Sequence, residues 1–224
     1  MTTELFLHIL DANRIELPDG AQDSLLQYAS LLKDWNAKIN LISRKDEDNI
    51  LERHILHSLL LRMPAICEYD FGNKRVLDIG TGGGLPGIPL KIVTPNCNIT
   101  LIDSIQKKIA ACSAMISQLG LTGIEAVGGR AEELAKLPKF SHSFDAVISR
   151  AVAPLDELAK WSKGLLKPNG ILLALKGGDL SEEIGRTERF KFVAGVEEKP
   201  IELVGYDGFA HEGKKLVSVV LKGP

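Results

Sequence analysis

Residues 76–90, with the sequence VLDIGTGGGLPGIPL, combine an acid, closely spaced glycines and two prolines. An apolar run ends at Asp78, and a glycine-rich turn follows it. Pro86 and Pro89 fall in the first turn of a helix, where their missing N–H groups need no partner. Because glycine has no Cβ and tolerates positive φ, such a turn lets backbone N–H groups approach a ligand closely. The pattern predicts a strand, a ligand-binding loop and the start of a helix.

The spacing of the glycines distinguishes three kinds of ligand loop. A nucleoside triphosphate loop needs Lys-Ser or Lys-Thr after its glycines, and neither follows here. A dinucleotide fingerprint is formally present at Gly82, Gly84 and Gly87, but so many glycines match several patterns by chance. The better match is Asp-x-Gly-x-Gly-x-Gly, which begins at Asp78 and continues through Gly80. An acid at that place would repel a pyrophosphate, and it suits the ammonium group of the methionine part of S-adenosylmethionine.

A second acid favours a ligand that carries a nucleoside. Asp103 ends the next apolar run, residues 98–103, at about the place expected for a carboxylate that accepts hydrogen bonds from ribose hydroxyls. Residues 129–132 (GRAE) follow a third strand, where the backbone and Glu132 can meet an adenine ring. The alternative is a glycine-rich turn that closes an ordinary strand–helix unit and binds no ligand.

Composition limits the class of protein. The chain has 224 residues, of which 45% are hydrophobic and 25% charged, as is typical of a globular domain with a full core. We expect neither a signal peptide nor a membrane span. The three cysteines, Cys67, Cys97 and Cys112, lack metal-ligand spacing, so we expect buried thiols, no metal and a reducing cytoplasm. The formal net charge of −2 means that RNA binding would need a local basic patch.

The first third of the chain has helical periodicity. Residues 3–63 predict three helical segments, with Asp19 or Asp23 as the cap of the second and Asp46 as the cap of the third. The third segment places four apolar residues on one face: Leu51, Ile55, Leu59 and Met63. We interpret residues 1–73 as a helical cap packed beside a second part of different pattern.

From residue 74 strands and helices alternate. The expected strands are 75–79, 98–103, 124–127, 144–149 and 171–175, and the expected helices are 85–93, 105–119, 131–137 and 154–164. Residues 166–170 predict a turn, and residues 215–221 predict one more strand, antiparallel and near an edge. The alternation predicts an α/β fold with a doubly wound, mostly parallel sheet over residues 74–224, forming one compact unit with the N-terminal helices.

Charged residues next to strand ends are further candidates, because ligands bind at the carboxyl ends of parallel strands. Arg150 follows the strand at 144–149, and its alternative is a surface arginine in a salt bridge. Lys176 follows the next strand. Arg53 and His54 either line a substrate or cofactor pocket or form a polar helix face. His54 and His57 lack a third metal ligand at a useful spacing.

The requirements of methyl transfer depend on the acceptor atom. The reaction is an in-line displacement in which the enzyme aligns acceptor and methyl group. No cysteine nucleophile follows the fourth or fifth strand, and residues 149–154 (SRAVAP) lack the Asp/Asn-Pro-Pro-aromatic motif used for exocyclic amines. A ring nitrogen such as guanine N7 has no proton to remove and needs neither nucleophile nor general base. We therefore assign no catalytic residue, and small-molecule acceptors stay open.

The sequence DIGTGGGLPGIPL of residues 78–90 resembles the signature of the bacterial ribosomal RNA small-subunit methyltransferase G family, also called glucose-inhibited division protein B. The likeness is collinear from about residue 31 to 177 and includes WN at 35–36, NL at 40–41, RHI at 53–55, LIDS at 101–104, ISRA at 148–151 and LKG at 175–177. This chain departs from the family pattern at His57, in the place of an Asp, and at Ile42, in the place of a Thr.

The resemblance implies a Rossmann-like class I methyltransferase that uses S-adenosylmethionine to methylate N7 of a guanine in 16S ribosomal RNA. It implies cofactor contacts by residues on four segments: Gly80, Leu85, Asp103, Ala131, Glu132 and Arg150. The motif adds Asp78 and Gly82, and the candidate RNA contacts are Arg53, His54 and Lys176. The expected partner is 16S ribosomal RNA or a precursor of the small ribosomal subunit, and the expected state is a monomer.

Three other readings stay open at this point. One is a small-molecule methyltransferase on the same fold, and another is a nicotinamide-dependent oxidoreductase, against which Asp78 argues. The third is a cofactor-binding interaction protein without catalytic activity.

Overall fold

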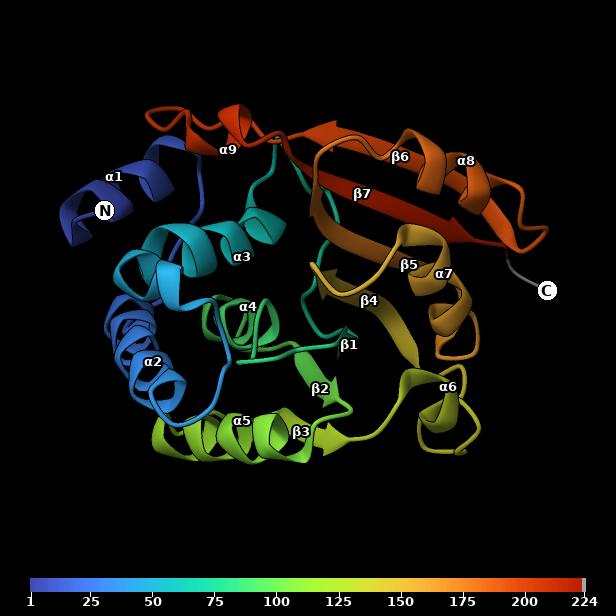
Figure 1. Ribbon diagram of the computed structural model, residues 1–224, viewed down its shortest axis with the longest axis horizontal. Helices are drawn as coiled ribbons and strands as arrows, with labels where there is room; N and C mark the ends of the chain where they lie inside the picture. The colour runs from blue at the N-terminus through green and yellow to red at the C-terminus, as the bar shows by residue number, and fades with distance from the viewer. Residues whose placement is uncertain (223–224) are drawn as a thin grey trace.

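A seven-stranded sheet forms the centre of the computed structural model, which describes residues 1–222 (Figure 1). The strand order is β3-β2-β1-β4-β5-β7-β6. Strands β1 to β5 are parallel, whereas β7 runs antiparallel to both of its neighbours. The strands are β1 (Arg75–Ile79), β2 (Asn98–Asp103), β3 (Ile124–Gly128), β4 (Phe144–Arg150), β5 (Leu166–Gly177), β6 (Val193–Pro200) and β7 (Lys214–Leu221). The predicted doubly wound, mostly parallel sheet is confirmed.

Helices cover both faces of the sheet, and successive strand residues point into two separate cores (Figure 1). Val76 packs with α1, α2, α4 and α5, whereas Leu77 packs with α6 and α7 on the other face. The helices are α1 (Thr3–Ala12), α2 (Ala21–Asn36), α3 (His57–Leu59), α4 (Gly87–Val93), α5 (Gln106–Gln118), α6 (Ala131–Leu134), α7 (Leu155–Lys163), α8 (Ser181–Glu188) and α9 (Gly208–His211). One core thus joins the N-terminal helices to the sheet, and the division at residue 73 stays a prediction.

The register brings the predicted site residues to one edge of the sheet. Ile79 pairs with Ile102 on one side and with Ser149 on the other, so β1, β2 and β4 end together. Asp103 and Arg150 are the last residues of β2 and β4 and therefore lie at this carboxyl edge. This is the edge at which parallel α/β sheets bind their ligands.

The third N-terminal helix differs from the prediction. In its place the chain forms a 3₁₀ turn (Arg44–Asn49), a π turn (Leu51–Leu56), the short α3 and a second 3₁₀ turn (Leu60–Arg62), and Met63 lies beyond them. Ser43 precedes the first turn and caps it, whereas Asp46 lies inside this turn and forms an ion pair with Arg53. The cap of α2 was also wrong. Gly20, in a left-handed conformation, precedes α2, and neither Asp19 nor Asp23 caps it.

The C-terminal part contains elements that the pattern did not predict. Strand β7 is antiparallel as expected but is not an edge strand, because β6 lies outside it. Strand β5 begins at Leu166, so the expected turn lies inside it. Helix α8 and strand β6 were missed, since both carry mostly charged and small residues. Within residues 1–222, no helix combines the length and the apolar character needed to cross a bilayer.

Candidate functional site

A cavity of about 470 Å³ opens at the carboxyl edge of the sheet. This volume lies in the range of sites that hold small molecules and cofactors. The cavity is bordered by the ends of β1 and β2, the loop before α6 and the loop after β4, through Ile79, Gly80, Ile102, Asp103, Ser104, Ile105, Lys108, Gly129, Arg130, Ala131, Glu132, Ala151, Val152 and Trp161. Four predicted cofactor contacts line it together: Gly80, Asp103, Ala131 and Glu132.

The glycine turn, residues 80–87, starts this site at the end of β1. Gly80 has a φ of +68°, and a Cβ there would lie 2.5 Å from a γ-carbon of Val152. Only glycine fits this position without displacing a neighbour or straining the backbone. Thr81 N–H donates to the carbonyl of Ile102 (3.0 Å), and Leu85 N–H donates to the carbonyl of Thr81 (2.9 Å). The turn is therefore fixed to β2 and closed by its own backbone.

Asp78 supports the turn from below. Its side chain is fully buried, and Oδ2 accepts hydrogen bonds from the Thr81 hydroxyl (2.6 Å) and from Gly87 N–H (3.0 Å). Oδ1 has no hydrogen-bond partner among the described residues. Burial raises the pKa of Asp78 to about 7, although the two hydrogen bonds oppose this shift. Asp78 does not line the cavity, so its contact with a ligand ammonium stays a prediction.

Asp103 lies in the cavity wall and links the turn to β2. Its Oδ2 accepts a hydrogen bond from Gly82 N–H (3.1 Å), and its Oδ1 accepts one from Ile105 N–H (2.9 Å). The Lys108 ammonium lies 3.9 Å from Oδ2. Each carboxylate oxygen can accept a second hydrogen bond, so these contacts leave Asp103 free to bind a pair of hydroxyl groups. This geometry fits the ribose partner expected from the sequence.

The other predicted cofactor contacts lie around the cavity at different depths. Ala131 and Glu132 open α6, with Ala131 buried and Glu132 exposed at the rim. Gly82 and Leu85 belong to the turn, but neither lines the cavity, and Leu85 is buried against the hydrophobic core. The placement keeps the turn and the start of α6 on opposite sides of Asp103.

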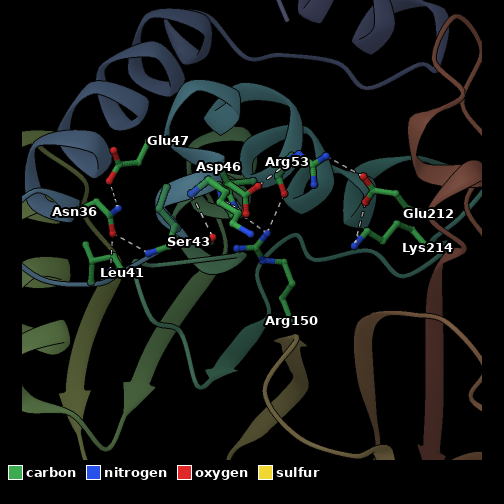
Figure 2. A network of polar contacts seen from close by, with 12 residues as sticks. Asn36, Leu41, Ser43, Asp46, Glu47, Arg53, Arg150, Glu212 and Lys214 are labelled. Carbon is green, nitrogen blue, oxygen red and sulfur yellow. Dashed lines mark hydrogen bonds and ion pairs between the residues drawn. The ribbon is translucent and has the colours of Figure 1, made fainter.

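Arg150 does not point into the cavity but into a polar network that lies beside it (Figure 2). Its Nη1 donates to the carbonyl of Arg53 (3.1 Å) and lies 3.0 Å from His54 Nδ1. Burial, and then the charges of Arg150, Arg53 and Lys214, lower the pKa of His54 to about 3. His54 is therefore neutral and accepts the hydrogen bond from Arg150 at Nδ1. Its Nε2 has no hydrogen-bond partner among the described residues, and Asp46 Oδ2 lies 4.0 Å away.

The three candidate RNA contacts are already engaged in the structure. Arg53 forms ion pairs with Asp46 (3.5 Å) and Glu212 (3.2 Å), as Figure 2 shows. Lys176 lies apart from these residues. Its Nζ pairs with Glu183 (3.0 Å) and donates to the carbonyl of Ala153 (2.9 Å), so it holds the loop that follows β4. An RNA contact by Arg53, His54 or Lys176 stays a prediction.

Sequence reasoning missed two residues that shape the site. Tyr28, fully buried on α2, donates its hydroxyl hydrogen to the carbonyl of Gly83 (2.9 Å). Val152 packs on Gly80 and closes the cavity over the turn. No local signal marks Tyr28, whereas Val152 could have been found as a neighbour of Arg150 after a strand end. The cysteines are all buried, as expected.

Comparison with known proteins assigns the chain that forms this site to a family. A family model described as rRNA small subunit methyltransferase G matches residues 21–207. The ribosomal RNA small subunit methyltransferase G of Chlorobaculum tepidum is 45% identical over 204 residues, which cover 87% of this chain and 90% of the relative. That of Chlorobium limicola is 48% identical, over 76% of this chain and 74% of the relative. The chain belongs to the rRNA small subunit methyltransferase G family. The resemblance seen in the sequence is thereby confirmed, and the chain is a methyltransferase.

Solved structures agree with the fold at low sequence identity. A putative methyltransferase from Haloferax volcanii, in complex with the Trm112 activator, has a TM-score of 0.60 and 15% identity, with 85% of this chain and 97% of that chain covered. The [4+2]-cyclase SpnF has a TM-score of 0.54 and 17% identity, with 93% and 97% covered. Because this Rossmann-like fold also carries a cyclase, family membership and not fold decides the class of enzyme.

Proposed function

We propose that this protein methylates N7 of a guanine in 16S ribosomal RNA. The observation that carries the proposal is a cavity in which Gly80, Asp103, Ala131 and Glu132 meet, in a chain that belongs to the methyltransferase G family. The cofactor is S-adenosylmethionine, which supplies a methyl group on a positively charged sulfur. The RNA or a small-subunit precursor is the partner, and we propose a cytoplasmic monomer.

The residues around the cavity fit this cofactor. Asp103 has acceptor capacity left for ribose hydroxyls, and the segment from Gly129 to Glu132 offers backbone and an acid to an adenine ring. The turn at Gly80 exposes backbone close to the cavity, and the unpartnered Oδ1 of Asp78 lies below it. Asp78 lies behind the turn and not in the cavity wall, so its contact with the ammonium group is proposed from the motif and from this unpartnered oxygen.

The acceptor chemistry follows from what surrounds the site. Guanine N7 has a free lone pair, so the chain needs to align the base and exclude water but does not need to remove a proton. Burial raises the pKa of the Cys112 thiol, whose sulfur donates to the carbonyl of Gly82 (3.3 Å). Burial also raises the pKa of Cys97, which lies outside the cavity directly before β2, to about 11. Neither thiol can supply a thiolate nucleophile near neutral pH. This supports an acceptor that requires no covalent intermediate.

Transfer of a labelled methyl group tests the proposal. Ribosomal RNA from cells that lack the protein is incubated with purified protein and labelled S-adenosylmethionine, and methylated guanines are mapped. We expect label at N7 of a guanine in the small-subunit RNA, lost in Gly80→Asp and incorporated more slowly in Arg150→Ala. The matched controls are Gly185→Ala, which has open space around it, and the exposed Arg189→Ala. Absence of label in RNA, with label transferred when a small-molecule extract of the same cells is supplied instead, would contradict the proposal.

A further inference from the structure

The segment that runs from the end of α2 into the start of the first 3₁₀ turn carries three exposed, positively charged side chains. This basic loop, residues 37–45, contains Lys38, Arg44 and Lys45 and no acid. All three side chains are exposed, and none forms an ion pair with any residue from 1 to 222. Lys38 places its ammonium over the ring of Trp35, 4.9 Å from the centroid, which leaves its outer side open to solvent.

The basic loop lies directly against the glycine turn. A Cβ at Gly83 would be 3.3 Å from the Leu41 Cβ, and one at Gly82 would be 3.7 Å from the Leu41 carbonyl oxygen. The buried Asn36 fixes the loop, because its Oδ1 accepts hydrogen bonds from Leu41 N–H (2.8 Å) and Ile42 N–H (2.9 Å). Leu41 is thus held against the glycine turn by defined backbone contacts, and the three cations lie within four residues of Leu41 along the chain.

The acids that follow the basic loop are neutralised or hydrogen-bonded elsewhere. Their partners lie on α2 and in the π turn: Asp46 pairs with Arg53 (3.5 Å), Glu47 accepts a hydrogen bond from Asn36 Nδ2 (2.6 Å), and Asp48 pairs with Lys33 (3.1 Å). Figure 2 shows Asp46 and Glu47 turned toward these partners. Within residues 1–222, none of these acids forms an ion pair with Lys38, Arg44 or Lys45, so the three cations are available to an anion from outside the protein.

We propose that the basic loop binds the sugar–phosphate backbone of the RNA next to the guanine that is methylated, an inference that rests on the proposed function. A chain with a net charge of −2 has no overall attraction to RNA, so a local cluster must supply it. Phosphate contacts fix the position and register of a nucleic acid without reading its sequence. Contacts beside the turn would place one nucleotide over the site while its neighbours stay bound.

The location agrees with this role. Ser43 lies in the loop and Asp46 directly follows it (Figure 2). The Asp46 carboxylate lies 4.0 Å from His54 Nε2, and His54 Nδ1 contacts Arg150. The chain therefore runs from the glycine turn, which Leu41 contacts, to the network at the end of β4, which Asp46 reaches. A base that enters between these two elements would have its backbone on the loop.

A charge-neutral triple variant tests the inference. Lys38→Gln, Arg44→Gln and Lys45→Gln are combined, and binding to small-subunit RNA is measured between low and moderate salt. We expect weaker binding and a salt dependence, log K against log salt, that is shallower by about 2, because three phosphate contacts to single-stranded RNA are lost. Affinity for S-adenosylmethionine by calorimetry and the free energy of unfolding should not change.

The matched control removes the same number of positive charges from the amino edge of the sheet, which is opposite to the site. Arg189, Lys191 and Lys222 are exposed, and none forms an ion pair among the described residues. They lie near the pairing of Val193 with Leu221, at the amino edge of the sheet. Replacement of these three by Gln should leave RNA binding and its salt dependence as they are.

Two results would overturn the inference while leaving the proposed function intact. One is methylation of RNA with unchanged affinity and salt dependence in the loop variant. The other is a defect confined to particles that contain ribosomal proteins, with normal binding to naked RNA, which would assign the loop to a protein partner. If the unmodified protein itself transfers no methyl group to RNA, the proposed function fails instead.

Discussion

The two polar regions beside the cavity are built in different ways. The glycine turn comes from one short stretch of chain, and its hydrogen bonds close on itself, on Asp78 and on Asp103. The network around Arg150 joins parts of the chain that are 97 residues apart, from Arg53 on the π turn to Arg150 at the end of β4. A local turn and a long-range assembly thus border the same site.

Each of the two regions contains a buried side-chain atom without a hydrogen-bond partner, but the regions are held together in different ways. In the turn, Asp78 Oδ1 is the buried side-chain atom that lacks a partner among the described residues. In the network, the Nε2 atom of His54 is likewise buried and unpartnered among these residues. Backbone and carboxylate hydrogen bonds hold the whole turn in one shape, whereas single side-chain contacts of the network can be removed one at a time. We therefore expect abrupt effects of substitution in the turn and graded effects in the network.

The largest effect is expected for Gly80→Ala. The new Cβ would lie 2.5 Å from a Val152 γ-carbon, and alanine disfavours a φ of +68°. We expect a loss of about 100-fold or more in kcat/KM, because displacement of the turn misplaces the reacting groups. Steady-state methyl transfer measures it. Val152→Ala in the same chain should restore part of the rate by removing the clash, and failure of this rescue would show that backbone conformation alone is responsible.

Substitution of Arg150 should have the next largest effect. Arg150→Ala leaves the Arg53 carbonyl and His54 Nδ1 without a donor, and we expect kcat/KM to fall by about 10- to 100-fold. His54→Ala should cost less, and the double variant should resemble Arg150→Ala, because His54 acts by holding the guanidinium. Initial rates and calorimetry of cofactor binding check this cycle. Losses that multiply in the double variant would mean that the two side chains act independently.

Asp78→Asn should change how stability depends on pH. Burial raises the folded-state pKa of Asp78 to about 7 from 3.8, so between these values the folded protein holds a proton that the unfolded chain has lost. This group therefore lowers the free energy of unfolding by about 1.4 kcal/mol for each pH unit as the pH rises through that window. Asn retains an acceptor for Thr81 and Gly87 but does not titrate.

Urea unfolding at pH 5, 6 and 7 tests this expectation. The difference in free energy of unfolding between Asp78→Asn and the unmodified protein should move in favour of the variant at each step. Parallel pH profiles of the two proteins would show that Asp78 is ionised throughout this range.

The smallest effect is expected for Glu212→Gln at the outer end of the network. Glu212 pairs with Arg53 (3.2 Å) and Lys214 (3.3 Å), and all three side chains are partly exposed. Surface ion pairs of this kind contribute about 0 to 1 kcal/mol, so the free energy of unfolding should change by less than about 1 kcal/mol. Urea unfolding at two salt concentrations measures it. A larger loss would show that the network is as tightly coupled as the turn.

The same contrast explains what could be predicted from the sequence. The glycine turn, strands β1 and β2 and the place of Asp103 depend on residues adjacent in the chain, and all were predicted within one or two positions. The direction of the Arg150 side chain depends on a turn 97 residues earlier, which no local pattern reports. The burial of Asp78 has a local cause instead, because Thr81 and Gly87, which follow it closely in the chain, bind its carboxylate beneath the start of α4.

The prediction failed where local preference is weak. The predicted apolar face of the third helical segment is confirmed for Ile55, Leu59 and Met63, which are buried. Hydrophobic spacing alone, however, cannot distinguish a regular helix from 3₁₀ and π turns, so the type of helix was wrong. Strand β6 contains the run Glu197, Glu198 and Lys199, which lowers strand propensity, and forms because β7 presents an unpaired side to it.

The bond between Tyr28 and the Gly83 carbonyl has a consequence for the order of events during synthesis. Helix α2 leaves the ribosome well before β1 and α4, yet its buried side chains, among them Leu25 and Leu32, pack in the core that those later elements complete. The early helix must wait, with an apolar face uncovered, until at least residue 93 has been translated and is free to fold. Nascent chains whose synthesis stops before residue 93 should therefore remain bound to chaperones, whereas longer chains should be released.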